Sequence, residues 1–168
     1  MTKTEVKLAI ELLKNNKIII LPTDTIYGLS GSVSKENQIK INNIKGSPKE
    51  KPLIVLISSL KQLPVEVFRD KKLLNILKLK KPTTVIIPMI DSSESIAIRL
   101  VKSNPIKKII SKVGPIFSTS ANKSKIKYKE GEVIFNNISP AVERVFYAGN
   151  LENEPSTIIN FSDMSKKR

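Results

Sequence analysis

Short runs of apolar, mostly β-branched residues recur along this chain, and segments with helical spacing separate several of them. The first run is Ile18–Leu21, and Pro22 stops it because proline has no backbone N–H to donate to a sheet. Further runs typical of strands lie at 53–57, 84–87, 95–100, 115–117, 144–148 and 156–161. Strands that alternate with helices, with some antiparallel pairing, predict an α/β fold with a mixed parallel and antiparallel twisted sheet and flanking helices.

Helix signals stand between these runs. Thr2–Glu5 has the form of a capping box and precedes apolar residues at helical spacing, which predicts a helix to about Asn15. Ser34 and Asp70 are N-cap candidates for two more helices. The remaining signals are Gly46 and Pro82 as helix ends, Asn104-Pro105 as the start of a helix over 106–113, a charged surface loop at 123–132, and an ambiguous segment at 133–138.

The length of the chain bounds its organisation. Its 168 residues fit a single domain, 1–168, with one core. The longest apolar runs fall well short of the roughly 18 residues that a membrane-spanning helix needs. Residues 1–16 carry glutamates among the apolar residues and so do not form a signal peptide. We therefore expect a cytoplasmic protein.

Cysteine and histidine are both absent from the chain. Disulfides, thiolate catalysis, cysteine- or histidine-ligated metals and a Ser-His-Asp triad are therefore excluded. Any chemistry must rest on hydroxyls, carboxylates, lysine, arginine and the backbone, which favours reactions that need positioning and charge neutralisation.

The formal net charge of +14 suggests polyanionic partners such as RNA or nucleotide phosphates. Only four of the 29 basic residues are arginine, however, and the chain is also rich in isoleucine and asparagine. These are the residues that an AT-rich coding bias favours. A functional basic surface and a compositional bias both remain open.

Four polar clusters follow or precede buried strands, where open α/β sheets bind ligands. The clusters lie at 23–28, 45–52, 118–122 and 156–157. The cluster 45–52 holds three lysines among prolines and a glycine and is either a triphosphate clamp or a solvated basic turn. Arg99 lies inside an apolar strand, so it either snorkels from a sheet edge or meets a buried anion such as a substrate carboxylate.

The order of these clusters resembles that of the YrdC-type threonylcarbamoyl-AMP synthases. The matching segments are Pro22–Leu29, Lys45-x-x-Pro-x-x-Lys-Pro-Leu53, Ile96–Arg99, Ser118–Asn122 and Pro155–Ile159. The resemblance implies a nucleotidyltransferase that makes threonylcarbamoyl-adenylate and pyrophosphate from ATP, L-threonine and bicarbonate. It also implies a role in tRNA modification, with partner proteins that transfer the threonylcarbamoyl group to adenosine in tRNA.

The resemblance implies roles for eight residues. Four would be catalytic, and with Ser120 they would bind ATP: Lys45, Lys51, Ser118 and Asn122. Threonine would be held by Thr23, by Arg99 through its carboxylate, and by Ser156, which would close the pocket. Magnesium would arrive with ATP, and no protein-bound metal site is evident.

The chain departs from the family pattern at Ser47. The family usually has Lys-x-Arg where this chain has Lys45-Gly46-Ser47, so a bidentate anion clamp is replaced by a hydroxyl. The remaining motifs favour a working enzyme in which a lysine replaces that clamp. The alternatives are a non-catalytic RNA- or nucleotide-binding module of the same fold and the related carbamoyl-adenylate chemistry of hydrogenase maturation, which normally comes with zinc-binding cysteines.

Overall fold

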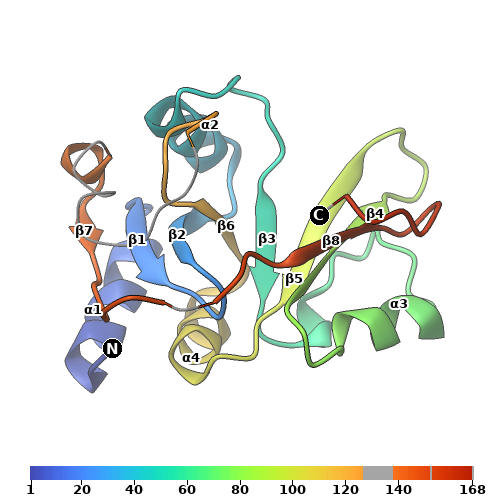
Figure 1. Ribbon diagram of the computed structural model, residues 1–168, viewed down its shortest axis with the longest axis horizontal. Coiled ribbons are helices and arrows are strands. Elements are labelled where there is room, and N and C mark those ends of the chain that lie inside the picture. Colours follow the sequence, from blue (N-terminus) through green and yellow to red (C-terminus); the bar gives the residue numbers. More distant parts are fainter. Residues whose placement is uncertain (127–137, 152, 168) are drawn as a thin grey trace.

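The computed structural model describes residues 1–126, 138–151 and 153–167 (Figure 1). Residues 133–137 of the predicted ambiguous segment 133–138 and most of the predicted loop 123–132 therefore lie outside the described residues. The strands are β1 (Ile19–Pro22), β2 (Tyr27–Ser32), β3 (Ile54–Ile57), β4 (Thr83–Pro88), β5 (Ser95–Leu100), β6 (Ile116–Ser120), β7 (Arg144–Val145) and β8 (Thr157–Asn160).

The eight described strands form one sheet in the order β7-β1-β2-β6-β3-β5-β4-β8. Three neighbouring pairs are parallel, namely β7–β1, β3–β5 and β4–β8, and the other four are antiparallel. The predicted hairpin exists as the antiparallel β4–β5 pair, in which Thr84 is opposite Arg99. The prediction of a mixed α/β sheet is confirmed.

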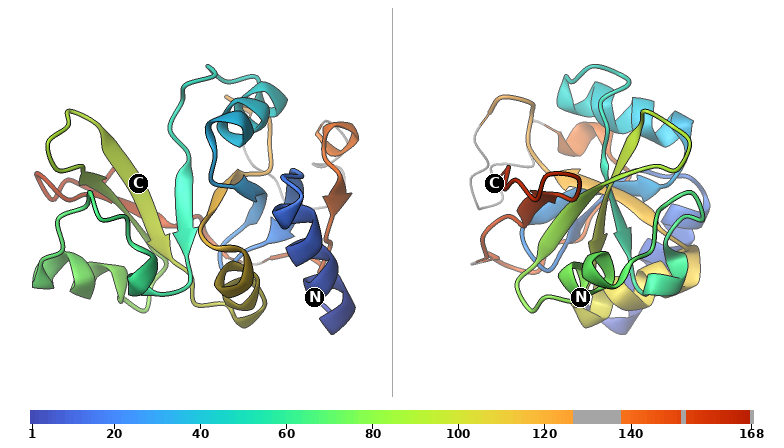
Figure 2. Two further views of the ribbon diagram at one scale, coloured as in Figure 1. Left: turned by 180° about the vertical axis from the view of Figure 1, so that it is seen from behind. Right: turned by 90° about the vertical axis from the view of Figure 1, so that its right-hand side faces the viewer.

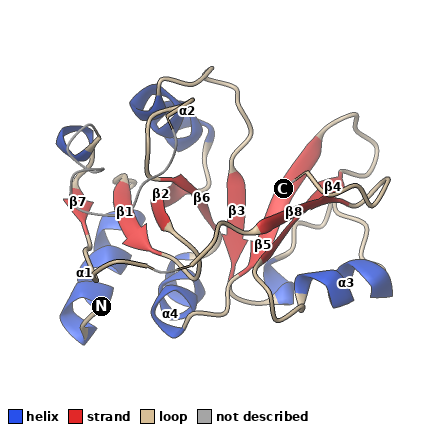
Figure 3. Ribbon diagram, viewed as in Figure 1, coloured by secondary structure: helices blue, strands red, loops and turns tan. Residues whose placement is uncertain are grey.

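Helices cover both sides of the sheet. They are α1 (Lys3–Lys14), α2 (Lys35–Lys45), α3 (Lys71–Leu77) and α4 (Asn104–Val113), with short 3₁₀ turns η1 (Leu60–Gln62) and η3 (Ser139–Ala141). Figures 2 and 3 show the four helices around the row of strands. Helices α1 and α4 pack on one face of the sheet, and α2 and α3 pack on the other, where their two core clusters share Phe117. Among the described residues, every helix is too short or too polar to cross a membrane.

Local capping explains where the helices begin. The Thr2 hydroxyl accepts a hydrogen bond from the backbone of Glu5, whose carboxylate accepts one from Thr2, so the capping box is confirmed. The predicted N-caps of α2 and α3, Ser34 and Asp70, also accept backbone hydrogen bonds. The α4 prediction is wrong by one residue, because Ser103 is the N-cap and proline takes the second helical position.

Alternate residues of β1 enter different parts of the core. Ile19 and Leu21 pack with apolar residues of α1 and α4, whereas Ile20 packs with Ile41 of α2. Side chains of a strand point alternately to the two faces of the sheet. The sheet is thus covered on both faces, which explains why β1 is a continuous apolar run rather than an alternating one.

Strand β2 was not predicted, because the motif 22–29 was interpreted as a loop. It contains Gly28, Ser30 and Gly31, which have weak strand propensity. In the structure β2 lies between β1 and β6 and is almost wholly buried. A Cβ atom on Gly28 would lie 2.2 Å from the Ser118 Oγ, so the close approach of β6 requires glycine here.

Candidate active site

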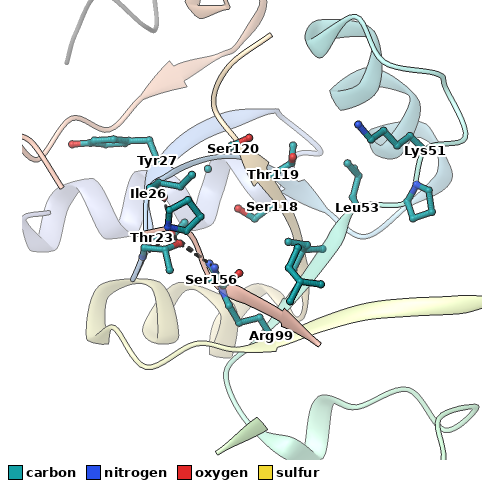
Figure 4. Close-up of a pocket in the computed structure, with 16 residues that line it drawn as sticks. Thr23, Ile26, Tyr27, Lys51, Leu53, Arg99, Ser118, Thr119, Ser120 and Ser156 are labelled. Carbon is teal, nitrogen blue, oxygen red and sulfur yellow. Dashed lines mark hydrogen bonds between the residues drawn. The ribbon is translucent and has the colours of Figure 1, made fainter. Parts of the chain in front are cut away.

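A cavity of about 320 Å³ opens where the predicted motifs meet (Figure 4). This volume lies at the lower end of the range typical of small-molecule sites, about 300–1,000 Å³. Its walls come from the β1–β2 connection, β2, β6, the start of β3, β5 and β8. The lining residues are Thr23, Thr25, Ile26, Tyr27, Gly28, Lys51, Pro52, Leu53, Ile54, Arg99, Ser118, Thr119, Ser120, Pro155, Ser156 and Ile158.

A buried network of hydroxyls and a guanidinium forms one end of the cavity. Arg99 Nη1 donates to Thr25 Oγ1 at 3.0 Å, and Nη2 donates to Thr23 Oγ1 at 3.4 Å, the bond dashed in Figure 4. Thr23 Oγ1 in turn donates to the Ile26 carbonyl at 2.7 Å. These bonds fix the guanidinium at the cavity wall, where it can bind a carboxylate in a fork geometry.

Asp24 supplies the buried anion that Arg99 meets. Its Oδ1 lies 3.1 Å from Arg99 Nη2, and both side chains are buried. Arg99 does not snorkel from an edge, because β5 lies between β3 and β4. Asp24 itself is absent from the cavity lining. It therefore compensates the charge of Arg99 without lining the cavity itself.

Strand β6 brings Ser118 and Ser120 to the cavity. Ser118 Oγ accepts a hydrogen bond from Ser30 Oγ of β2 at 3.3 Å, and Thr119 lies between the two serines in the lining. Three successive residues of the cluster 118–122 thus line the cavity. Such groups bind phosphate and ribose oxygens.

Ser156 enters the cavity from the residue before β8. Its hydroxyl lies 2.8 Å from that of Thr84 on the neighbouring strand β4, and both side chains are buried. Thr84 is not among the site residues predicted from the sequence, because its contact with Ser156 depends on the parallel pairing of β4 with β8. The pairing holds Ser156 next to Arg99 in the close-up view (Figure 4).

Lys51 is the lysine of the 45–52 cluster that lines the cavity. Figure 4 shows it away from Thr23 and Arg99, on the side nearer α2. Its backbone N–H donates to the Pro48 carbonyl at 3.0 Å, which closes the turn that follows α2. The cavity therefore has a cation near each end, one from Arg99 and one from Lys51.

Lys45 and Asn122 lie outside the cavity lining. The Lys45 Nζ donates to the Ser120 carbonyl at 2.5 Å and to the Asn122 carbonyl at 2.6 Å. Burial and the charge of Lys51 lower the pKa of Lys45 to about 8. The Asn122 amide donates to the Ile126 carbonyl. As contacts of the nucleotide, both residues stay predictions.

Ser47 also lies outside the cavity lining. Its backbone N–H donates to the Asn42 carbonyl at 2.8 Å, and within the described part of the chain its buried Oγ has no hydrogen-bond partner. Tyr27, in contrast, lines the cavity, and its hydroxyl donates to the Gly149 carbonyl at 2.5 Å. Tyr27 is a wall residue whose hydroxyl is held by backbone.

The fold is thus a mixed α/β sheet whose strand ends enclose a cavity lined by hydroxyls and two basic side chains. Residues 11–168 match the family model Sua5/YciO/YrdC, described as "Telomere recombination". The match covers almost the whole chain, so the chain belongs to the Sua5/YciO/YrdC family.

Several curated relatives are about 30% identical to this chain over the segments that align. A protein of Methanocaldococcus jannaschii, named provisionally as a threonylcarbamoyl-AMP synthase, is 31% identical over 97% of this chain and 85% of its own length. A threonylcarbamoyl-AMP synthase of Haemophilus influenzae is 31% identical over 67% of this chain and 69% of its own. The match to the Pyrococcus abyssi synthase is shorter and spans 50% of this chain and 26% of that protein.

Solved structures show the same fold. Sua5 of P. abyssi, crystallised with L-threonine, superposes with a TM-score of 0.83 at 22% identity, over 99% of this chain and 53% of that one. YciO of E. coli gives a TM-score of 0.81 at 20% identity over 95% of this chain and 85% of its own. The chain thus spans about half the length of Sua5 and most of the length of YciO.

Proposed function

We propose that the protein is an L-threonylcarbamoyl-adenylate synthase that makes threonylcarbamoyl-AMP and pyrophosphate from L-threonine, bicarbonate and ATP. The observation that carries this proposal is one cavity in which Arg99 and Thr23 lie at one end and Lys51 and Ser120 line the wall. The curated relatives with this name support it, as does the P. abyssi Sua5 structure with L-threonine.

The Arg99 end of the cavity suits an amino acid. The Arg99 guanidinium can donate hydrogen bonds to a carboxylate, while Thr23, Thr25 and Asp24 hold the guanidinium in place. Ser156, fixed by Thr84, adds a hydroxyl beside it that can contact the side-chain hydroxyl of threonine.

The opposite wall suits a nucleotide triphosphate. Lys51 neutralises phosphate charge, while Ser118 and Ser120 offer hydroxyls to phosphate or ribose oxygens. Threonine and bicarbonate form a carbamate with loss of water, and the carbamate oxygen attacks the α-phosphate as pyrophosphate leaves. No protein nucleophile is required, which fits a cavity built without cysteine or histidine.

The described residues fit a magnesium ion carried by the nucleotide. Among them, no three acidic side chains gather as a metal site, and Asp24, which lies between the two lining residues Thr23 and Thr25, is paired with Arg99. When bound with ATP, the ion would supply neutralisation of phosphate charge. The chain's own residues then align the two substrates.

The proposal extends to the wider role that the resemblance implies. The product would pass to proteins that transfer the threonylcarbamoyl group to tRNA in the cytoplasm. Lys45 and Asn122 would support the nucleotide end, and residues 1–168 would act as one domain. Direct contact with RNA would use the basic surface.

Pyrophosphate release tests the proposal. The purified full chain with ATP and magnesium should release pyrophosphate only when L-threonine and bicarbonate are both present, and mass spectrometry should detect threonylcarbamoyl-AMP. Omission of either substrate is the matched control. No release, together with RNA binding that weakens as salt rises, would overturn the proposal in favour of a non-catalytic RNA-binding module.

A further inference from the structure

Helix α2 carries a row of polar side chains where a globular helix normally buries apolar ones. Gln38, Asn42 and Lys45 follow one another at i, i+4 and i+7, so they lie on one face of the helix. Asn42 is fully buried and Lys45 is 6% exposed. Buried polar groups need hydrogen-bond partners. The side-chain nitrogen of each of the three residues, including the half-buried Gln38, donates to backbone carbonyls of a loop.

The first two residues of the row hold the loop that carries Lys51. The Asn42 Nδ2 donates to the carbonyls of Lys49 and Lys51, both at 2.9 Å. The Gln38 Nε2 donates to the carbonyls of Glu50 at 3.2 Å and Lys51 at 3.1 Å. The Lys51 carbonyl thus accepts from two side chains of the same helix, which fixes the backbone of the lysine that lines the cavity.

The third residue holds the turn after β6. The Lys45 Nζ bonds the carbonyls of Ser120 and Asn122, and the Lys45 carbonyl accepts from the backbone of Ser124 at 2.8 Å. The Lys123 Nζ donates to the Ile44 carbonyl at 2.7 Å. Helix α2 and the turn are therefore joined from both directions, next to Ser120 of the cavity wall.

We propose that the polar face of α2, formed by Gln38, Asn42 and Lys45, sets the spacing between the Lys51 loop and the Ser120 turn and so positions the nucleotide end of the cavity. The three are positioning residues, since their polar atoms contact backbone carbonyls and not the cavity. The assignment of this end to the nucleotide rests on the proposed function. The positioning itself can be measured without turnover.

Asn42→Leu is the sharpest variant. Leucine can stay buried at this position, and it removes the Asn42 Oδ1, which has no hydrogen-bond partner among the described residues. It also removes the two hydrogen bonds that the Asn42 amide donates to the loop. Asn43→Leu is the matched control, because Asn43 is the next residue of α2 and its side chain is exposed.

Amide hydrogen exchange of the ligand-free full chain reads the positioning directly. Asn42→Leu should speed exchange at the Lys51 amide about tenfold and leave α1 unchanged, and Asn43→Leu should leave both unchanged. Lys45→Met should speed exchange at the Ser124 amide. If Lys45 served only to contact phosphate, exchange without nucleotide would not change, and that result would overturn its assignment here.

Kinetics separates positioning from general destabilisation. Asn42→Leu should raise the KM for ATP about tenfold while the KM for threonine changes less than twofold. Equal rises in both KM values, or unchanged exchange at Lys51, would overturn the proposal. A wild-type chain that releases no pyrophosphate would contradict the proposed function and leave the exchange result as the test of the α2 face.

Discussion

The Asp24 Oδ1 lies 3.1 Å from the Arg99 Nη2, and the two side chains are 9% and 6% exposed. The partners come from the β1–β2 connection and from β5, so the pair ties the motif loop to the far half of the sheet. The same guanidinium bonds Thr23 and Thr25. One buried ion pair thus stabilises the fold and orients the group proposed to bind the substrate carboxylate.

Arg99→Met should therefore reduce both stability and substrate binding. It leaves the Asp24 carboxylate buried without its cationic partner, and breaking a buried pair costs about 3–5 kcal/mol in the free energy of unfolding. Urea unfolding measures this cost.

Arg99→Lys should retain the charge but lose the fork geometry. Its KM for threonine should rise by at least about tenfold, with the KM for ATP little changed. Arg69→Lys is the matched control, because Arg69 is exposed and does not line the cavity. A parallel rise in both KM values for Arg99→Lys would contradict a specific contact with threonine.

Gly28→Ala should destabilise the pairing of β2 with β6. The added methyl would meet the Ser118 Oγ at 2.2 Å, and overpacking of this kind costs about 1–3 kcal/mol in the free energy of unfolding. Removal of that oxygen in Gly28→Ala/Ser118→Ala should recover part of the loss. Urea unfolding of the two single variants and the double variant measures the coupling, and additive losses would show that the clash lies elsewhere.

The same contact explains why β2 could not be predicted. Runs rich in isoleucine and valine revealed β1, β3, β4 and β5, because strand propensity reflects packing on a pleated surface. Gly28 carries no such signal, yet it lies opposite Leu21 of β1 and opposite Ser120 of β6, about 90 residues later in the chain. A non-local pairing of this kind cannot be predicted from the residue pattern of the segment alone.

The candidate site was likewise predicted only in part from the sequence. Six of the eight residues that the motifs indicated line one cavity, because motif position sets which loop a side chain belongs to. Lys45 shows that the position of a residue in a motif does not determine what its side chain contacts. The sequence places it at the start of the basic cluster 45–52, but in the structure it is the last residue of α2. Its amine donates to two backbone carbonyls, which depends on where the Ser120 turn lies. The supporting amides of α2 were missed for the same reason.

Ser47→Arg should preserve or raise activity. The Ser47 Oγ makes no hydrogen bond among the described residues, so its replacement removes no contact, and arginine would restore the anion-binding group that the family usually has nearby. Ser47→Ala is the control and should behave like the wild type. Steady-state measurement of kcat/KM for ATP tests this prediction. A large loss of kcat/KM in Ser47→Arg would show that the site is built around serine.

Lys45 should titrate well below the exposed lysines. Burial and the charge of Lys51 lower its pKa to about 8 from the ordinary lysine value of 10.5. NMR of the lysine side chains in the folded protein measures both values. Lys51→Met should raise the pKa of Lys45 without restoring the ordinary value, because burial, the larger cause, remains.

The lowered pKa of Lys45 also determines how the free energy of unfolding changes with pH. The unfolded chain keeps the ordinary lysine pKa of 10.5, so between pH 8 and 10.5 the unfolded state binds more protons than the folded state does. The contribution of Lys45 to the free energy of unfolding therefore rises with pH across that window. Urea unfolding should show the wild type gaining stability relative to Lys45→Met from pH 8 to 10. A constant difference, with Lys45 titrating near 10.5, would mean that the carbonyls of Ser120 and Asn122 offset the cost of burying the ammonium.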